Sequence, residues 1–472
     1  MTRSATESDM SYSIPVKDSD RISFQVAARE ANTIRHIVPL TQLVLLTNSA
    51  EWRVTSVNSD ALTPTSISVR PQSYIGANNV QPSIVNNSLV YCAARDGHVR
   101  ELGYSWQANG FITGDLSLRA AHLFDSYTIS DMAYQKSPHP VLWFVSSNGK
   151  LLGLTYIPEQ QIGAWHQHDT DGAFESVTCV AEGAEDHVYV IVKRTVAGTV
   201  RRFVERMESQ QFDSLVNSFY MDCGLTYDGK NTTTTTVTVS NGSTWDKTDV
   251  LTLTASTPIF QYPQQTDIND AIVISNGNGA SYRFRIVATT STTVASAVVD
   301  IVVPESLRNV ATTNWSFARD SVSGLSHLEG KTVSILADGA VMPQVVVKNG
   351  IATLLRAAVK IHVGLPYQSD LQTLPMTINI DAFGQGRYKA INKVWLRVYR
   401  SSGIFIGPDP DNLVESKQRT NETYGSPPEL KSDEILVVLT PSWASSGQIY
   451  VRQSDPLPLL ISGATIEVAI GG

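Results

Sequence analysis

The stretch that decides the fold is Val141–Leu154, which reads VLWFVSSNGKLLGL. An apolar run is followed by a short polar segment ending in Asn148-Gly149, and a second apolar run comes directly after it. Asn-Gly is among the strongest short hairpin signals, because both residues tolerate a positive φ. We therefore predict two antiparallel β-strands joined by a tight turn.

The same pattern recurs on both sides of this stretch. Apolar runs begin at Leu43, Leu89, Val141 and Val188, at spacings of 46, 52 and 47 residues. Each run is followed by a small or polar pair and a second strand-like run, and the pairs are Asn48-Ser49, Asp96-Gly97, Asn148-Gly149 and Ala197-Gly198. A period of about 40–50 residues with several strands per unit is typical of propeller blades. Four units predict a partial β-propeller.

The rest of the chain is also strand-like, so the sequence predicts an all-β protein. We expect an N-terminal extension at 1–19, propeller blades at 20–221, an inserted small β-barrel or sandwich at 222–322, and a C-terminal β-sandwich-like domain at 323–472. The polar stretch 415–433 is predicted to be a long surface loop. The best helical candidate is short, around Ser117–Phe124.

Composition restricts the function. The 472-residue chain has a net charge of −8 and only 17% charged residues, which argues against tight binding of duplex DNA. Its three cysteines, Cys92, Cys179 and Cys223, form no CxxC pair, so we expect free thiols that pack as small hydrophobes. We predict neither a signal peptide nor a membrane span, because the first residues are polar and no apolar run approaches about 20 residues.

One segment imitates a phosphate-binding loop. Gly324–Val341 reads GLSHLEGKTVSILADGAV, with Gly330-Lys331-Thr332 as in a P-loop. The P-loop pattern has four residues between its glycines and continues into a helix, whereas this segment has one residue more and continues into an alternating, strand-like run. We predict a glycine-flanked turn and strand, and we expect neither an enzyme nor a cofactor.

His166 and His168 are the candidate metal ligands. They alternate within WHQHDTDG (Trp165–Gly172), so a strand would place both on one face, with Asp169 and Asp171 as further oxygen donors. The alternative interpretation is a sheet-edge strand that ends in a turn, which explains the same residues without a metal.

The hairpin Lys193–Arg206 is the candidate contact surface. It is unusually basic for this chain, and its cations are Lys193, Arg194, Arg201, Arg202 and Arg206. They are candidates for lining a channel or contacting an acidic partner or DNA. The alternative is an ordinary solvated outer strand.

Several long stretches resemble one known family. They are DRISFQVAAREANTIRHIVPLTQLVLLTNSAEWRV (from Asp20), VRPQSYIGANNVQPSIVNNSLVYCAARDGHVRELGYSW (from Val69), LLGLTYIPEQQIGAWHQHDTDGAFESV (from Leu151), GLSHLEGKTVSILADGAV (from Gly324), KIHVGLPYQSDLQTLP (from Lys360) and RQSDPLPLLISGATIEVAIGG (from Arg452). They resemble the C-terminal two-thirds of phage tail nozzle proteins, the tail tubular protein B class of short-tailed phages. The Thr-rich insert is similar to a small β-domain that such proteins share with a half-domain of ubiquitin-activating enzymes.

The resemblance implies a structural protein of the phage tail in the virion. Such a protein would form a homohexameric ring, meet an upstream tail adaptor and tail fibres or spikes, and provide a conduit or gate for DNA ejection without sequence-specific binding. Family members carry a sizeable region ahead of the part that resembles DRISF, so either that part is absent here or another segment completes the ring. The alternative is a receptor-binding or glycan-degrading β-propeller of the tail.

Overall fold

The computed structural model describes residues 1–28, 30–57, 61–95, 97–277, 279–377, 386–417 and 426–471. It is nearly all β, with 50% of residues in strands and 4% in helices, as predicted. The chain divides into two compact units, Met1–Glu208 and Ser209–Gly472, and each is described by itself.

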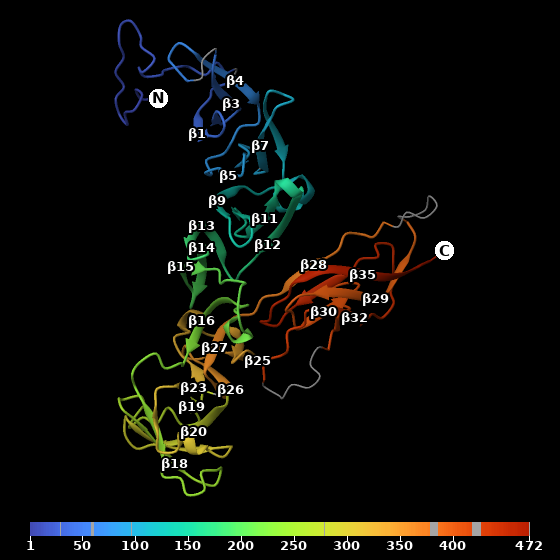
Figure 1. Ribbon diagram of the computed structural model, residues 1–472. Coiled ribbons are helices and arrows are strands. Elements are labelled where there is room, and N and C mark those ends of the chain that lie inside the picture. The colour runs from blue at the N-terminus through green and yellow to red at the C-terminus, as the bar shows by residue number, and fades with distance from the viewer. Residues whose placement is uncertain are drawn as a thin grey trace. The chain divides into compact units, whose positions relative to one another are not determined.

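The first unit consists of four antiparallel sheets whose strands follow chain order (Figure 1). The first sheet contains β1 (Ile34–Pro39), β2 (Leu43–Thr47), β3 (Glu51–Ser56) and β4 (Ile67–Ser73). The second contains β5 (Ser83–Val85), β6 (Ser88–Cys92), β7 (Val99–Ser105) and β8 (Gly110–Asp115). The third contains β9 (Ile129–Gln135), β10 (Val141–Ser146), β11 (Leu151–Ile157) and β12 (Ile162–His168). The fourth contains β13 (Ala173–Glu182), β14 (Glu185–Val196) and β15 (Thr199–Arg206).

The four predicted hairpins are confirmed. They are the pairs β2–β3, β6–β7, β10–β11 and β14–β15, and all are antiparallel. Asp96 of the second predicted turn lies outside the described residues. The predicted helix is instead a short, kinked 3₁₀ segment, η1 (Leu118–Leu123), because Ala120 has non-helical dihedral angles. A second 3₁₀ turn, η2, spans Pro158–Gln160.

Consecutive sheets of this unit share hydrophobic cores. Leu142 and Phe144 of β10 pack with the second sheet, whereas Trp143 and Val145 pack with the fourth. Both faces of β10 are therefore buried, which explains why its sequence is a continuous apolar run. The first and second sheets share a further core, which includes Leu46 of β2. The other face of the first sheet is covered by the extended segment that contains Phe24, Val26 and Ala28.

The second unit contains four described sheets, and the first part of this unit holds an eight-stranded and a four-stranded sheet. In spatial order the larger has β22 (Ala311–Thr312), β17 (Val237–Ser240), β18 (Leu251–Ala255), β21 (Val294–Val299), β20 (Ser281–Thr289), β19 (Ala271–Ser275), β23 (Trp315–Val322) and β26 (Ala352–Ala358). The smaller has β16 (Asp222–Asp228), β27 (Lys360–Leu365), β24 (Thr332–Ala337) and β25 (Ala340–Val346). The 3₁₀ turns are η3 (Leu215–Asn217), η4 (Glu305–Leu307) and η5 (Ser326–Leu328).

The inserted segment has its own core. Alternate residues of β17, β18, β19, β20, β21 and β23 all contribute to one hydrophobic cluster, so the sheet curls around a single interior. The Trp315 indole in this interior donates to the Thr235 carbonyl at 2.9 Å. Strand β16 pairs with β27, and the insert therefore interrupts the smaller sheet after Asp228.

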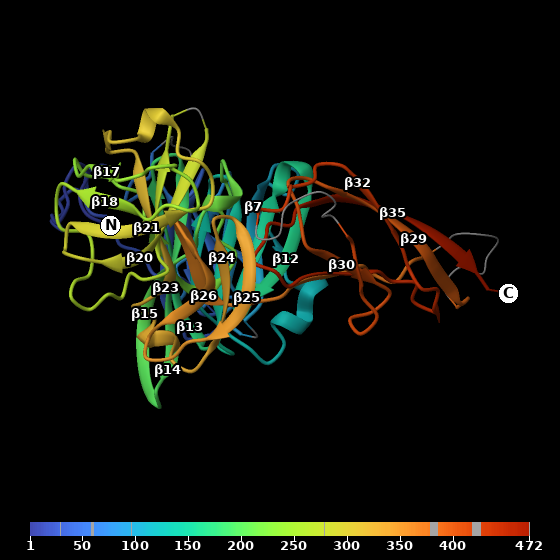
Figure 2. The ribbon, with the colours of Figure 1, turned by 90° about the horizontal axis from the view of Figure 1, so that it is seen from below.

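The C-terminal part is a sandwich of two sheets that share one core. One sheet has β28 (Ser369–Gln372), β34 (Tyr450–Gln453), β30 (Ile404–Gly407) and β31 (Val414–Glu415). The other has β32 (Glu434–Val438), β29 (Lys389–Val398), β33 (Trp443–Ala444) and β35 (Ile461–Ile470). Figure 2 shows β29, β32 and β35 at this end of the chain, seen from below. Residues 418–425 of the predicted 415–433 loop lie outside the described residues.

The remaining local expectations concern the P-loop-like segment, the thiols and the membrane. Lys331 precedes strand β24 and no helix follows, so this segment is a turn and a strand as predicted. The three cysteines form no disulfide; Cys92 is buried, whereas Cys179 and Cys223 are half-buried. Among the described residues, no helix has the length and apolar character needed to cross a membrane.

Candidate functional site

The basic hairpin β14–β15 forms the last pair of strands in the first unit. Its turn has positive φ at both Ala197 and Gly198, 49° and 76°. In the strand register Lys193 faces Arg202 and Arg194 faces Arg201, so each pair of like charges shares one face of the sheet. Directly opposed like charges repel, and this arrangement requires compensating carboxylates.

Glutamates supply that compensation. Arg194 is only 4% exposed and forms a bidentate pair with Glu205, with both N···O distances 2.7 Å. On the other face Arg202 pairs with Glu175, and its guanidinium lowers the pKa of that carboxyl. Arg206 lies 3.2 Å from both Glu182 and Glu208. The hairpin is therefore a network of ion pairs rather than a continuous cationic stripe.

Lys193 and Arg201 are exposed and belong to none of these ion pairs, so of the five candidates they can most readily meet a partner. Arg194 also donates to the Asp171 carbonyl at 3.0 Å, which connects β14 to the loop after β12. Its role is thus to hold two sheets together. The face of the hairpin that carries Lys193 and Arg202 also exposes Ile191, Val200 and Val204, at 37%, 52% and 74%. The surface is mixed apolar and charged, a composition that suits a protein partner better than a phosphate backbone.

His166 and His168 lie on one face of β12, as predicted, with ring centroids 5.0 Å apart. Each ring is 5.4 Å from the Trp143 indole, at the margin of the core between the third and fourth sheets. Gly153 lies opposite His166 and leaves room for its ring, since a Cβ there would approach its Cε1 to 2.2 Å. Burial lowers the pKa of His166, so its ring is held neutral against the indole.

Within the part of the chain that the structure describes, no third ligand joins the two histidines. In the described ranges there is no group of three or more His, Cys, Asp or Glu side chains that could hold a metal ion. The geometry therefore favours aromatic packing of the two rings on Trp143.

A Ser-His-Asp cluster, which sequence reasoning did not single out, lies beside β7 and β8. Ser117 Oγ donates to Asp115 Oδ1 at 2.6 Å, and His98 Nδ1 is 2.9 Å from the same hydroxyl. Burial by itself would raise the pKa of Asp115. Hydrogen bonds from Ser117 and the charges of His98 and Arg100 outweigh burial, so the pKa of Asp115 is lowered. Because Ser117 is fully buried, its hydroxyl cannot reach a substrate, and the cluster closes the turn after β8.

A buried acidic pair lies in the second unit, before β19. Arg319 Nη1 lies 3.5 Å from Asp267 Oδ1 and 3.4 Å from Asp270 Oδ2. The Asp320 amide donates to Asp270 Oδ1 at 2.8 Å. Burial raises the pKa of Asp270 to about 7, since one guanidinium shared between two carboxylates does not fully replace their hydration. The group connects the turn before β19 to the neighbouring strand β23 of the eight-stranded sheet.

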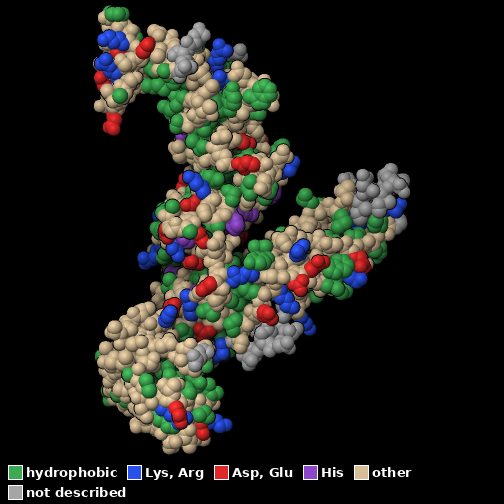
Figure 3. All heavy atoms as spheres, in the orientation of Figure 1, with side chains coloured by type: hydrophobic (Ala, Val, Ile, Leu, Met, Phe, Trp, Pro, Cys, Tyr) green, Lys and Arg blue, Asp and Glu red, His purple; other side chains and the backbone are tan. Residues whose placement is uncertain are grey.

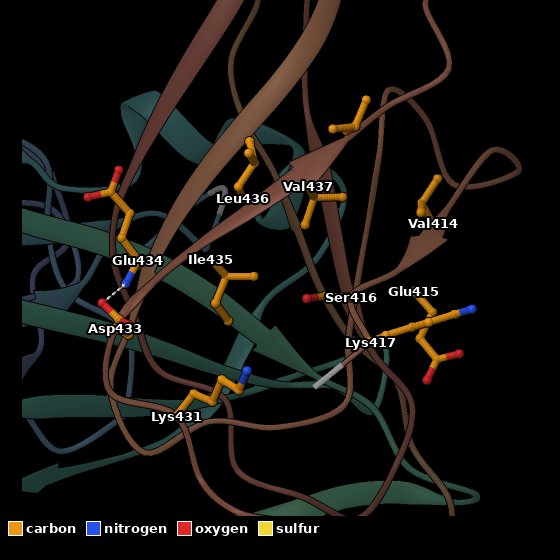
Figure 4. Close-up of a pocket in the computed structure, with 11 residues that line it drawn as sticks. Val414, Glu415, Ser416, Lys417, Lys431, Asp433, Glu434, Ile435, Leu436 and Val437 are labelled. Carbon is orange, nitrogen blue, oxygen red and sulfur yellow. Dashed lines mark hydrogen bonds between the residues drawn. The ribbon is translucent and has the colours of Figure 1, made fainter. Parts of the chain in front are cut away.

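The C-terminal sandwich contains an open groove of about 490 Å³ along β32. Figure 4 shows Glu415 and Lys417 on one side and the residues of β32 on the other. Charges of both signs and aliphatic side chains line it, and they form no set of groups that could act together on a substrate.

No family model matches the chain, and no curated protein matches it either.

Proposed function

We propose that this chain is a structural virion protein, a subunit of the tail nozzle of a short-tailed phage that forms the conduit or gate for DNA ejection. The observation that carries the proposal is the series of four meander sheets with shared cores, together with the family-like stretches that lie on it. Asp20–Val54 comprises β1 to β3 and the segment that covers them, and Leu151–Val177 comprises β11, β12 and the start of β13.

Physical properties of the unit support a mechanical role. Successive sheets bury residues against one another, and such close-packed interiors are rigid. The clusters His98-Asp115-Ser117 and His166-His168 both serve packing or turn formation. We propose blades of a partial propeller as the wall element and a homohexameric ring as the assembly.

Charge supports the same proposal. With a net charge of −8, the subunit would repel rather than trap DNA moving past it. The basic hairpin is largely neutralised by glutamates, and we assign Lys193 and Arg201 to contacts with protein neighbours, such as a tail adaptor or fibre, rather than to the channel wall.

The test is electron microscopy of the purified protein together with light scattering. We expect rings with an axial channel and a mass about six times 51.5 kDa. A protein that stays monomeric at micromolar concentration and shortens a host polysaccharide would instead support the receptor-binding or glycan-degrading alternative.

A further inference from the structure

The fourth sheet of the first unit has one strand fewer than the others. The first three sheets have four strands each, and β4, β8 and β12 form the last edge. The corresponding place beside β15 holds no described strand. The third strands β3, β7 and β11 have at most one exposed residue each, whereas most residues of β15 are exposed. An open edge offers backbone N–H and C=O groups to another strand.

A second segment of the chain has the sequence of a strand but no strand partner. Met10, Tyr12, Ile14 and Val16 alternate with smaller or polar residues, which is the pattern of a half-buried strand. Their exposures are nevertheless 52%, 59%, 88% and 52%. Figure 1 shows this segment as a loop near the label N. Asp20 closes the loop by accepting the Ser13 and Lys17 amides, each at 2.8 Å.

We propose that Met10–Val16 of one copy adds as a fourth strand to the open edge of β15 in a second copy. In antiparallel pairing the four apolar side chains lie beside the outer face of β15, next to Val200 and Val204. Pro15 is one of the alternate residues whose backbone nitrogens point away from β15. Its lack of an N–H group therefore costs no hydrogen bond between the two strands. When the segment pairs, the hydrogen bonds from Ser13 to Asp20 are replaced by backbone hydrogen bonds to β15.

Charge complementarity supports this pairing. The first twenty residues contain four carboxylates and two basic side chains, whereas β15 contains three arginines and one glutamate. Nearby glutamates offset Arg202 and Arg206, so the attraction to the net acidic donor end comes mainly from Arg201, which takes no part in those ion pairs.

The order of the cores indicates a second copy rather than the same chain. The segment around Phe24 covers the outer face of the first sheet, and cores then join the first sheet to the second, the second to the third and the third to the fourth. Met10–Val16 is thus tethered at one end of the series and β15 lies at the other. Pairing between copies is then head-to-tail, a contact that gives a closed ring when the rotation between neighbouring copies closes. The inference deepens the proposed function by naming its subunit contact, and it rests on that function only for the number of copies.

Two single substitutions test the contact. Ile14→Asp alters the donor segment and Val204→Asp the acceptor edge, and Leu355→Asp is the matched control because Leu355 is 77% exposed on β26. By sedimentation velocity we expect each of the first two to weaken self-association at least about tenfold and the control to leave it unchanged. Circular dichroism verifies that all three remain folded.

Mixing the variants gives the sharper result. The Ile14→Asp chain keeps an intact β15 and the Val204→Asp chain keeps an intact donor, so their mixture should form heterodimers although each alone does not. If mixing the two variants does not restore association, the proposed pairing is wrong. It is also wrong if either variant alone associates as strongly as the wild type.

An engineered disulfide shows whether the Met10–Val16 segment that pairs with β15 comes from a second copy or from the same chain. Tyr12→Cys in one chain and Val204→Cys in a longer, tagged chain should give an interchain disulfide under mild oxidation, absent from chains without the new cysteines. If a chain with both Tyr12→Cys and Val204→Cys forms this disulfide only within itself, the segment does not come from a second copy. Rings that persist in Ile14→Asp overturn this contact and leave the nozzle proposal standing, whereas a wild type that never self-associates overturns both.

Discussion

Ala197 occupies the left-handed backbone region, with φ of 49°, at the turn between β14 and β15. For alanine this conformation costs about 1 kcal/mol or more in free energy, whereas asparagine adopts it more readily. We expect Ala197→Asn to raise the free energy of unfolding by about 1 kcal/mol. The reverse change Asn349→Ala, at φ of 54°, should lower it. Urea unfolding of both variants checks the prediction, and equal effects of the two would contradict it.

Asp270 gives stability a defined pH dependence. Its folded-state pKa is about 7 because of burial, whereas an unfolded aspartate titrates near 4. Between these values the folded state binds more protons, so this residue's contribution to stability falls as pH rises from 4 to 7. Asp270→Asn removes that slope.

We therefore expect the stability advantage of Asp270→Asn to be larger at pH 8 than at pH 5, by about 1–3 kcal/mol. Chemical unfolding at the two pH values measures it. Asp300→Asn, at an exposed position of the insert, is the control. An advantage that is the same at pH 5 and pH 8 would show that Asp270 is ionised throughout this range in the folded protein.

Gly229 shows how strands from distant parts of the chain constrain one residue. It follows β16, and its carbonyl accepts the Phe317 amide of β23 at 2.7 Å. A Cβ at this position would lie 1.9 Å from the Phe317 carbonyl oxygen. We expect Gly229→Ala to destabilise the protein by about 1–3 kcal/mol. Gly114→Ala, on β8 with open space around its Cβ position, should be nearly neutral in the same thermal unfolding experiment.

Figure 3 shows acidic and basic side chains interspersed on the face it presents. Combined with the net charge of −8, this predicts weak binding to DNA. By fluorescence anisotropy with a labelled duplex at physiological salt, we expect a Kd no tighter than about 10⁻⁶ M. Lys193→Glu and Arg201→Glu should change it little. A sub-micromolar Kd that these substitutions abolish would assign the basic hairpin to DNA instead.

The sequence predicted what short-range chemistry controls. Apolar alternation and turn residues determine where strands begin and end, so the four hairpins and the strand at Thr332–Ala337 could be read directly. In the turn at Asn148-Gly149 only Gly149 uses a positive φ, of 81°, and the Asn148 side chain instead accepts the Lys150 amide through its Oδ1. The basic residues of β14–β15 were visible, but their glutamate partners were not.

Only the tertiary structure decided which residues meet. Arg202 of β15 meets Glu175 of β13 because these two strands flank β14. His166 and His168 pack on Trp143 because β12 joins β11 in the third sheet. The missing strand beside β15 likewise becomes visible only once the four sheets are compared. By itself the sequence determined an acidic, all-β chain with repeated hairpins, because these depend on composition and near neighbours. Charge neutralisation, buried carboxylates and the open edge depend on register and sheet stacking, which join residues far apart in the chain.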